Sequence, residues 1–472
     1  MNTGTTIFDP AAIFLKTGEK TLSYHDLYCH AAGLKLIIAD PGSPIGVLTK
    51  NKETAILLIA SAWLNGLTVV PLSASASVSE LEYQVSLSGI QTLICDTGYT
   101  DIHEIIDVQI VDINRFVAAT SPAKPTTAGD DMLFGIFFTS GTSGKPKAVP
   151  LKRRQMISAA RSTAINNQLN PGDLWLHCLP LHHIGGVSII LRSLIYGSGV
   201  YSLEGFDLAC TADLLSSRRD VKAVSLVPTQ LSRLIEYPDF KPHDEFRFAL
   251  IGGGRVPDSL RKKAAGLVPS VFSYGMTETC AQIVATGIDN TAPSGSTGRV
   301  LAPNEMIICD ERGMQLDHGQ TGLICLRGPQ VFDGYLDENE NTFFPGGWFN
   351  TGDYGCTDSM ENLFLESRRE DRIVTGGENV DPVEVEMALL QLSGVSDAAV
   401  IGLADDEWGQ LVTAVIVAAP GITYSLNTLR AELKSQLTDY KIPRRLEVID
   451  ELPKTALGKV KKRELISRFD RI

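Results

Sequence analysis

Short apolar runs alternate with longer stretches of mixed polarity from residue 21 to about residue 280. Runs such as 45–48, 92–95 and 132–138 are typical of buried strands, because they are short and contain few polar residues. Stretches such as 53–64 and 154–167 carry apolar residues at helical spacing. Strands that alternate with helices predict an α/β fold in which parallel sheets are covered by helices on both faces.

The same pattern predicts the other elements of this large N-terminal region. Further strands are expected at 174–179, 221–227, 246–251 and 271–273. Further helices are expected at 22–39, 80–88, 187–194 and 229–235, and helix-compatible sequence begins at Leu151.

The pattern changes at residue 322. Short β-like runs at 323–327, 343–349 and 363–366 alternate with Gly and Asp turns, which predicts a small β-rich subdomain. The dense charged run at 367–372 that follows is interpreted as a linker, with a solvated loop as the alternative.

The last hundred or so residues have a pattern of their own. Asp381 and Pro382 are a typical N-cap and first helical residue. Strands are expected at 398–402, 412–417 and 446–449 and a helix at 426–437, which together predict a compact α+β domain. We therefore expect an N-terminal domain at 1–368 and a C-terminal domain at 369–472.

Composition narrows the class of protein. The 472 residues are 44% hydrophobic and 21% charged, as in an ordinary globular protein. With 42 Lys and Arg against 55 Asp and Glu, the net charge of −13 argues against nucleic acid as the main partner, because binding a phosphate backbone needs a basic face. No basic segment followed by an apolar core begins the chain, and no apolar run approaches the ~18–20 residues of a membrane span. We expect a cytoplasmic protein without stable membrane insertion.

The eight cysteines are scattered along the chain, and no two form a C-x-x-C pair. This spacing suggests neither a zinc knuckle nor a disulfide framework. Reduced thiols are expected, as is usual in a cytoplasm.

Polar segments directly follow several predicted strands, at 139–147, 180–186, 252–254 and 274–279. Open α/β sheets bind their ligands at the carboxyl ends of the strands. We therefore expect a binding site built from these segments.

The segment 139–147 has the composition of an anion-binding loop. Gly141 and Gly144 permit positive φ and close approach of the backbone. Hydroxyls and successive backbone N–H groups would surround phosphate oxygens, and two lysines add positive charge. The segment is not a Walker A loop, because Pro146 follows Gly144-Lys145. Local chemistry predicts an anion-binding loop and no more, and an ordinary surface loop remains the alternative.

Five strings, in order along the chain, resemble the motifs of one family. They are TSGTSGKPKAV at 139–149, SYGMTE at 273–278, NTGD at 350–353, the run 368–386 with TGGEN at 375–379, and LPKTALGK at 452–459. The chain resembles the adenylate-forming superfamily, which includes acyl-CoA synthetases, luciferases and nonribosomal adenylation domains. Ala148 stands where that family most often has Gly. The resemblance covers essentially the whole chain and implies ATP and Mg²⁺ as cofactors, with coenzyme A as co-substrate.

The resemblance also implies roles for residues in the adenylation step. Glu278 would help to hold Mg²⁺, Thr277 would lie near the α-phosphate, and Lys459 would be the catalytic lysine on a mobile C-terminal domain. Mg²⁺ and Lys459 would neutralise charge that develops during phosphoryl transfer. The residues implied in ATP binding are Thr139, Ser140, Gly141, Thr142, Ser143, Gly144, Lys145 and Lys147 for the phosphates, Ser273, Tyr274 and Gly275 for adenine, and Asp353 and Arg368 for ribose.

The family uses its C-terminal domain in two orientations, and the resemblance assigns residues to the second, thioester-forming one. Glu370 is the expected hinge, with Asp371 as the neighbouring alternative. Gly376 and Gly377 would line the passage for pantetheine. Trp408 would stack on the coenzyme A adenine, although ordinary aromatic packing is the alternative.

Within the superfamily, the segments 180–186, 273–284 and 295–299 are most similar to o-succinylbenzoate–CoA ligases of menaquinone biosynthesis. The usual aromatic-His pair is His182-His183 here, and Arg299 replaces the usual Lys. The acid-binding residues that this similarity implies are His183, Gly252, Gly253 and Ser296.

The expected substrate is a small aromatic or acyl carboxylic acid, and the resemblance implies 2-succinylbenzoate, activated by ATP and transferred to coenzyme A. Two alternatives stay open: another aryl- or acyl-CoA ligase, and a catalytically silent adenylate-binding or carrier-loading module. A homodimer is compatible with the sequence.

Overall fold

The computed structural model of the protein describes residues 8–76, 78–99, 107–122, 128–139, 146–167, 169–254, 256–288, 292–337, 342–368, 373–375, 378–405, 408–434, 436–437, 439–455 and 458–470. The chain forms two compact units. The first comprises Met1–Ala292, Thr297–Glu305 and Leu326–Phe343, and the second comprises Pro293–Ser296, Met306–Cys325 and Phe344–Ile472. The domain boundary expected at residue 368 stays a prediction.

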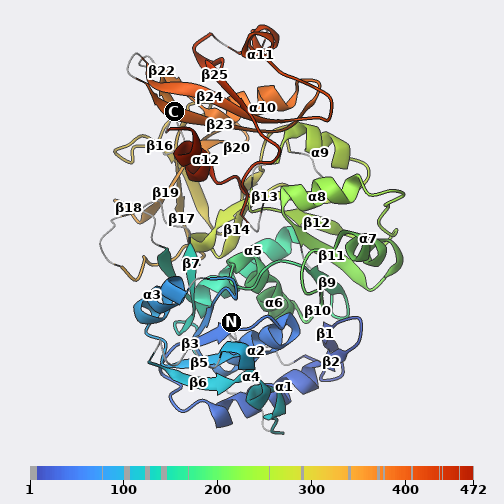
Figure 1. The fold of residues 1–472 in the computed structure, drawn as a ribbon. Coiled ribbons are helices and arrows are strands. Elements are labelled where there is room, and N and C mark those ends of the chain that lie inside the picture. Colours follow the sequence, from blue (N-terminus) through green and yellow to red (C-terminus); the bar gives the residue numbers. More distant parts are fainter. Residues whose placement is uncertain are drawn as a thin grey trace. The chain divides into compact units, whose positions relative to one another are not determined.

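The first unit contains a nine-stranded sheet in the order β15-β14-β13-β12-β11-β9-β10-β1-β2 (Figure 1). Its strands from β13 through β12, β11, β9 and β10 to β1 are parallel, and the pairs β13–β14, β14–β15 and β1–β2 are antiparallel. The strands are β1 (Ile13–Lys16), β2 (Thr21–Ser23), β9 (Leu174–His177), β10 (Gly199–Ser202), β11 (Val221–Leu226), β12 (Phe248–Ile251), β13 (Ser270–Met276), β14 (Ala281–Ala285) and β15 (Arg299–Val300).

A six-stranded sheet, in the order β6-β5-β3-β4-β7-β8, completes the β-structure of this unit. It is parallel except for the β7–β8 pair. The strands are β3 (Ile45–Leu48), β4 (Val69–Pro71), β5 (Thr92–Cys95), β6 (Gln109–Asp112), β7 (Leu133–Thr139) and β8 (Lys147–Lys152).

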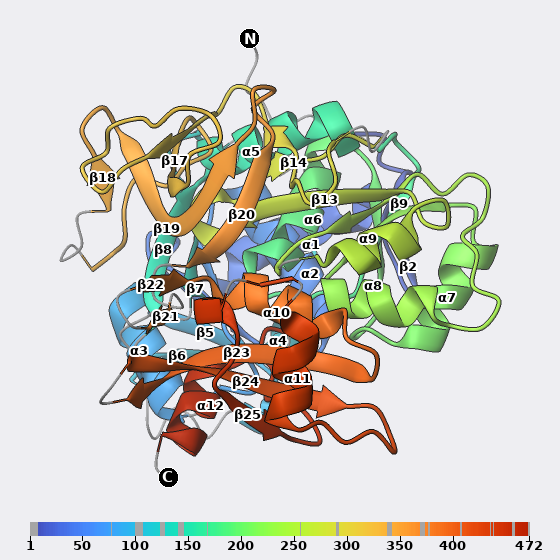
Figure 2. The same ribbon diagram turned by 90° about the horizontal axis from the view of Figure 1, so that it is seen from above.

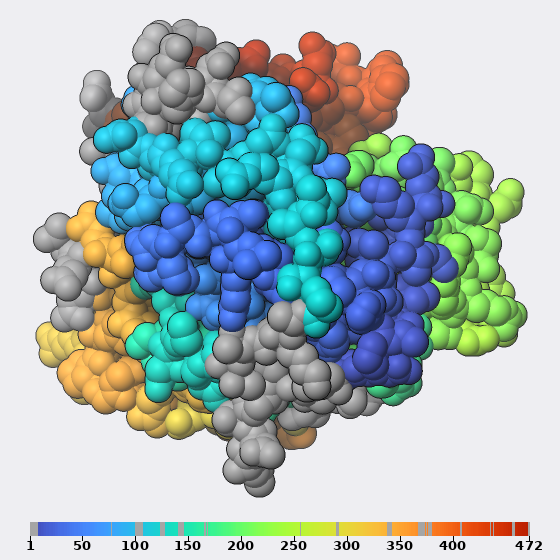
Figure 3. All heavy atoms as spheres, turned by 90° about the horizontal axis from the view of Figure 1, so that it is seen from below, coloured from blue at the N-terminus to red at the C-terminus, as the bar shows by residue number. Residues whose placement is uncertain are grey.

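Helices lie between and around these sheets. α5 contacts β8 of one sheet and β14 of the other, and α6 packs against α5. The face in Figure 3 is covered largely by the N-terminal part of the chain, drawn in blue to cyan, which includes α1 and α4. The helices are α1 (Tyr24–Ile37), α2 (Lys52–Asn65), α3 (Val78–Ser88), α4 (Ile113–Ala118), α5 (Arg153–Asn167), α6 (Ile184–Tyr196), α7 (Leu208–Ser217), α8 (Pro228–Ile235) and α9 (Asp258–Ala264), with the 3₁₀ turn η2 (Thr277–Thr279).

Local sequence signals explain where several helices begin and end. Ser23 caps α1 in a capping box with Asp26, so each side chain bonds the other residue's backbone N–H. Asn51 caps α2, and Gly66 ends it in the left-handed conformation. α2 is buried on nearly all sides, because its sequence is apolar almost all around the helix.

The second unit contains a five-stranded sheet in its β-rich part, and strands β19 and β20 of this sheet run side by side in Figure 2. The order is β16-β17-β19-β18, and β20 pairs with β19. The strands are β16 (Glu305–Cys309), β17 (Gly322–Arg327), β18 (Phe343–Phe344), β19 (Trp348–Thr357) and β20 (Leu363–Arg368).

A disulfide joins Cys309 on β16 to Cys325 on β17 in this sheet. The expectation that every cysteine is a reduced thiol is wrong for this pair. The two residues are 16 apart in sequence, and only the pairing of neighbouring strands brings them together. The spacing of cysteines along the chain carries no sign of that pairing.

The C-terminal residues form a further five-stranded sheet, β22-β21-β24-β23 with β25 beside β24. Alternate residues of β23 and β24 face opposite sides: one side packs on α10 and α11, and the other packs on α12. The elements are β21 (Ile373–Thr375), β22 (Glu378–Val380), α10 (Pro382–Leu390), β23 (Val395–Asp405), β24 (Gly409–Ala418), α11 (Leu426–Leu433), η4 (Asp439–Lys441), β25 (Arg445–Val448) and α12 (Lys462–Phe469).

The expected fold class, α/β layers followed by a β-rich sheet and a small α+β domain, is confirmed. The helix expected from Leu151 is wrong at its start, because β8 continues to Lys152 as the antiparallel partner of β7. The predicted cap of α10 by Asp381 is confirmed. Among the residues described, no helix is long and apolar enough to span a membrane.

Candidate functional site

The predicted phosphate loop connects the antiparallel strands β7 and β8. Thr139 and Lys147 are cross-strand partners at the ends of these strands. Ser140, Gly141, Thr142, Ser143, Gly144 and Lys145 lie outside the described residues. The structure therefore places the two ends of the loop beside each other at the edge of the six-stranded sheet.

The segment that follows β13 turns sharply at η2. Gly275 is required here, because a Cβ atom would collide with the carbonyl oxygen of Ala281 on β14. Thr279 holds the turn: its hydroxyl accepts a hydrogen bond from the N–H of Met276 at 3.0 Å, and its side chain is fully buried. Thr277 begins the turn, and Tyr274 on β13 is 8% exposed.

Glu278 is a carboxylate in a buried position, with 7% of its surface exposed. The hydroxyl of Tyr335 donates a hydrogen bond to its Oε1 at 2.7 Å, and the N–H of Phe332 donates to its backbone carbonyl at 2.8 Å. A buried carboxylate is costly unless it is hydrogen-bonded or paired, so this position indicates a specific use.

The predicted acid-binding residues of the first unit lie after β9 and β12. Gly252 and Gly253 follow β12, and Gly253 has a φ of 76°. A Cβ atom on Gly252 would lie 2.8 Å from Oγ of Ser273, whose hydroxyl donates to the carbonyl of Ile251 at 3.0 Å. The ends of β12 and β13 are thus bound to each other, and the glycine leaves room beside Ser273.

His183 is the N-cap residue of α6, and its ring centroid lies 4.3 Å from that of His182. Burial, with a smaller contribution from His182, lowers the pKa of His183 to about 4. Burial also lowers the pKa of His182. The pair is therefore uncharged at neutral pH, which suits contact with an aromatic ring better than pairing with a carboxylate.

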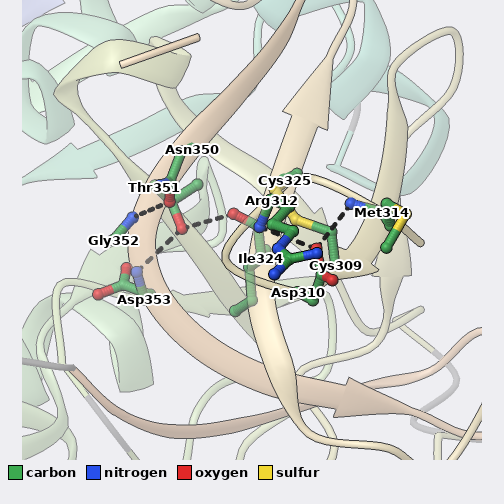
Figure 4. The surroundings of a disulfide bond; sticks show 10 residues. All are labelled: Cys309, Asp310, Arg312, Met314, Ile324, Cys325, Asn350, Thr351, Gly352 and Asp353. Atoms are coloured by element: carbon green, nitrogen blue, oxygen red, sulfur yellow. Dashed lines mark hydrogen bonds between the residues drawn. A yellow bond between two sulfur atoms is a disulfide. The ribbon is translucent and has the colours of Figure 1, made fainter. Parts of the chain in front are cut away.

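The second unit carries Asp353 on β19 and Ser296. Figure 4 shows how Asp353 is held: its N–H donates to Oγ1 of Thr351 at 3.1 Å, and the Thr351 hydroxyl donates to the carbonyl of Ile324 at 2.9 Å. Asp353 is 8% exposed, and its cross-strand partner is Arg368, whose side chain lies outside the described part. The Ser296 hydroxyl is buried and donates to the carbonyl of Leu363 at 3.1 Å.

Lys459 lies on a tight turn that leads to α12. Its carbonyl accepts a hydrogen bond from the N–H of Thr455 at 2.8 Å, its N–H donates to Oγ1 of Thr455 at 3.2 Å, and its side chain is exposed. Gly458 precedes it with a φ of 79°. The backbone of this lysine is therefore fixed on an exposed turn.

The predicted coenzyme A residues are only partly described. Gly376, Gly377 and the expected hinge Glu370 lie outside the described residues. Trp408 is described, and the guanidinium carbon of Arg444 lies 3.7 Å from its ring centroid. One face of the indole is covered by this arginine, so adenine would have only the other face for stacking.

The donor atoms around Glu278 fit Mg²⁺. Among the residues described, no group of three or more His, Cys, Asp or Glu side chains could hold a metal ion. Mg²⁺ is commonly held by one or two carboxylates together with substrate phosphates and water. Glu278 carries one hard oxygen ligand of this kind, and Thr277, the residue before it in η2, carries a hydroxyl.

Two contacts of the candidate residues, one in each unit, were missed by sequence reasoning. Tyr335 bonds to Glu278 from 57 residues further along the chain, and Arg444 stacks on Trp408 across 36 residues. The burial of a carboxylate after an apolar strand is a signal that a donor must be present, but it does not say which residue supplies the donor.

Comparison with known proteins gives two family matches. Residues 7–336 match the AMP-binding enzyme family, and residues 384–459 match the AMP-binding enzyme C-terminal domain. Among relatives, the 2-succinylbenzoate–CoA ligase of Enterococcus faecalis is 32% identical over 441 residues, which cover 91% of this chain and 90% of that protein.

Solved structures show the same similarity. The o-succinylbenzoate CoA synthetase of Bacillus subtilis, in complex with its acyl-adenylate intermediate, has a TM-score of 0.88 at 31% identity and covers 97% of this chain and 95% of its own. The same enzyme with ATP and magnesium ion gives 0.87 at 31%, with 97% of each chain covered. ATP-bound MatB of Rhodopseudomonas palustris gives 0.93 at 26% and covers 99% and 97%.

Proposed function

This chain belongs to the AMP-binding enzyme family, and we propose that it is an ATP-dependent acid–CoA ligase that converts 2-succinylbenzoate to 2-succinylbenzoyl-CoA in menaquinone biosynthesis. The observation that carries the proposal is the similarity to 2-succinylbenzoate–CoA ligases at 32% identity over 91% of the chain. The order of the five motifs and the buried carboxylate of Glu278 support the same reaction.

The reaction has two steps. In the first, an oxygen of the succinyl carboxylate attacks the α-phosphorus of ATP, and pyrophosphate leaves. In the second, the sulfur of coenzyme A attacks the carbonyl carbon of the acyl-adenylate, the thiol proton is lost, and AMP leaves. The mixed anhydride formed first makes the second attack easy, because AMP is a good leaving group.

Residues of the first unit are assigned to ATP and Mg²⁺. Glu278 would hold Mg²⁺, which supplies positive charge to the phosphates when bound. Thr277 would lie at the α-phosphate, and Ser273, Tyr274 and Gly275 would line the adenine pocket. The segment Thr139–Lys147 would hold the phosphates of ATP, where backbone N–H groups and lysines would neutralise charge.

Residues of the second unit complete the assignment. Asp353, with Arg368, would bind ribose, and Lys459 would neutralise charge on the reacting phosphates. Gly376, Gly377 and Trp408 would bind coenzyme A, and Glu370 would be the hinge of a mobile C-terminal domain.

The acid would contact His183, Gly252, Gly253 and Ser296.

We place the reaction in the cytoplasm, where ATP and coenzyme A are supplied. A homodimer stays a prediction, which light scattering on the purified protein would test.

An acid screen with the purified protein tests the function. With ATP, Mg²⁺ and coenzyme A, 2-succinylbenzoate should give pyrophosphate, AMP and a thioester. Its kcat/KM should be at least ~10²-fold above that for benzoate, because a site that hydrogen-bonds a polar group of its substrate strongly rejects an analogue that lacks the group. Preference for a medium-chain fatty acid would overturn the acid while leaving the ligase chemistry intact. Absence of pyrophosphate release with every acid would overturn the ligase itself.

Asp353 gives a second test, directed at ribose. Asp353→Ala should lower kcat/KM for ATP by ~10–100-fold, because hydrogen bonds to a charged acceptor contribute about 1.5–3 kcal/mol. The unsubstituted enzyme should prefer ATP to 2′-deoxy-ATP, and the variant should lose that preference. Asp317→Ala, which removes an exposed carboxylate of the same unit, is the matched control. A preference for ATP that persists in Asp353→Ala would contradict the ribose contact.

A further inference from the structure

Tyr335 lies between the two segments of the first unit that are assigned to the phosphates and the metal. Its hydroxyl donates to Oε1 of Glu278 at 2.7 Å. On the other side, Nζ of Lys147 lies 5.0 Å from the centroid of its ring. One side chain therefore contacts both the buried carboxylate after β13 and the lysine at the start of β8.

The backbone around Tyr335 is fixed to the same two segments. Three residues before Tyr335, Phe332 donates its N–H to the carbonyl of Glu278 at 2.8 Å. One residue after Tyr335, Leu336 donates its N–H to the carbonyl of Ala148 on β8 at 3.0 Å. The segment 332–336 thus bridges η2 and β8 through its backbone as well as through the tyrosine.

The tyrosine ring is held in place by aromatic packing. Its centroid lies 4.9 Å from that of Phe332, with an interplanar angle of 71°. Phe332 is 2% exposed and stacks on Phe343 at 5.7 Å. Edge-to-face packing of this kind restricts the ring, so the hydroxyl has a defined position relative to Glu278.

A phenol is well suited to orient a metal-binding carboxylate. It donates one strong hydrogen bond to the charged oxygen and carries no positive charge of its own, so it does not compete with a cation as an arginine or lysine would. Partners of this kind fix the orientation of a metal ligand, and their removal typically costs 10–100-fold in metal affinity. The ring below Lys147 adds a cation–π contact, which favours the lysine at this place.

We propose that Tyr335 is a positioning residue that orients the Glu278 carboxylate for Mg²⁺·ATP and holds Lys147 beside it through its ring. The proposal rests on the function proposed above, because it assigns Glu278 to Mg²⁺. The two parts of the side chain have different roles: the hydroxyl orients the carboxylate that binds the metal, and the ring positions the lysine.

Two substitutions distinguish these parts. Tyr335→Phe removes the hydroxyl and keeps the ring, whereas Tyr335→Leu removes both. Tyr99→Phe is a matched control, because the Tyr99 hydroxyl also donates a hydrogen bond, to the carbonyl of Ala74 at 3.0 Å, and its ring also lies near a lysine, Lys50, at 6.0 Å.

Calorimetric titration of ATP into each full-length protein, with excess Mg²⁺ or with EDTA, is the principal readout. Tyr335→Phe should weaken binding of Mg²⁺·ATP by about 10-fold or more and leave binding of ATP in EDTA unchanged. Tyr335→Leu should weaken both. In pyrophosphate release, the Mg²⁺ concentration for half-maximal rate should rise about 10-fold or more in Tyr335→Phe, and excess Mg²⁺ should restore most of kcat.

Several outcomes would overturn the proposal. Unchanged Mg²⁺·ATP affinity in Tyr335→Phe would remove the hydroxyl from the metal site. Equal weakening with Mg²⁺ and with EDTA in that variant, or a loss of thermal stability beyond that of Tyr99→Phe, would indicate a merely structural role. The binding measurements need no acid, so a protein that binds Mg²⁺·ATP through Tyr335 but activates none of the acids tested would contradict the proposed ligase function and leave the role of Tyr335 supported.

Discussion

Lys459→Ala is expected to slow acyl-adenylate formation by ~10²–10³-fold and to leave thioester formation from supplied acyl-adenylate nearly unchanged. The reason lies in where charge develops. In the first step a carboxylate attacks phosphorus that is surrounded by anionic oxygens, and an ammonium group lowers the energy of that transition state. The second step occurs at the carbonyl carbon and releases AMP, without departure of pyrophosphate.

The structure provides a matched control for this experiment. Lys461 is also exposed and lies two residues further on, and its Nζ lies 3.5 Å from a carboxylate oxygen of Glu464 on α12. Lys461→Ala removes the same charge from the same surface and should keep both half-reactions. Pyrophosphate release measures the first step, and thioester formation from synthetic 2-succinylbenzoyl-adenylate measures the second. Equal losses in both steps for Lys459→Ala would contradict the role assigned to this lysine.

Much of the fold could be predicted because the pattern of apolar and polar positions indicates which residues are buried. The apolar runs at 45–48 and 92–95 are β3 and β5, and the helical spacing at 154–167 is α5. The parallel order followed from the alternation of strands with helices. The antiparallel strand β8 was not predicted: helix-compatible sequence was expected from Leu151, but β8 continues to Lys152, and Pro150 lies within it at the edge of the sheet, where a strand tolerates proline.

Contacts between segments distant in sequence could not be predicted in the same way. The partner of Glu278 is Tyr335, and the sequence near either residue does not name the other. Likewise, Cys309 and Cys325 become neighbours only when β16 and β17 pair. The periodicity of apolar residues shows which face of a helix or strand is buried. These contacts depend instead on the order of the strands within a sheet and on the turns between them.

The groups proposed for the reaction also differ in burial, and this difference is compatible with the roles proposed for them. Glu278 is buried and bonded on both its backbone and its side chain, and Asp353 is 8% exposed with its N–H bonded to Thr351. Both are acceptors that must present oxygen atoms at fixed points. Lys459, in contrast, has a fixed backbone and an exposed side chain. A long flexible cation suits a charge that is needed in one half-reaction only.

Glu278→Gln is expected to lower the rate of adenylation by at least ~10²-fold and to raise the Mg²⁺ concentration needed for half-maximal rate. Gln has nearly the shape of Glu, and its amide oxygen still accepts the hydrogen bond of Tyr335. The substitution therefore removes the negative charge and preserves the packing. Since Mg²⁺ binds carboxylate oxygen far better than a neutral amide in sites of this kind, the loss should fall on the metal-dependent step.

Stability separates this effect from misfolding. Glu278 is 7% exposed and accepts the hydrogen bond of Tyr335, and Gln keeps the shape and an acceptor at this place, so Glu278→Gln should unfold at nearly the same temperature as the unsubstituted protein. Glu19→Gln, at an exposed carboxylate, controls for the general change in charge. Thermal unfolding and the Mg²⁺ dependence of pyrophosphate release give both quantities on the same samples. A variant that keeps its rate and its Mg²⁺ dependence would show that the charge of Glu278 is not used for the metal, and the metal ligand would then have to be sought elsewhere.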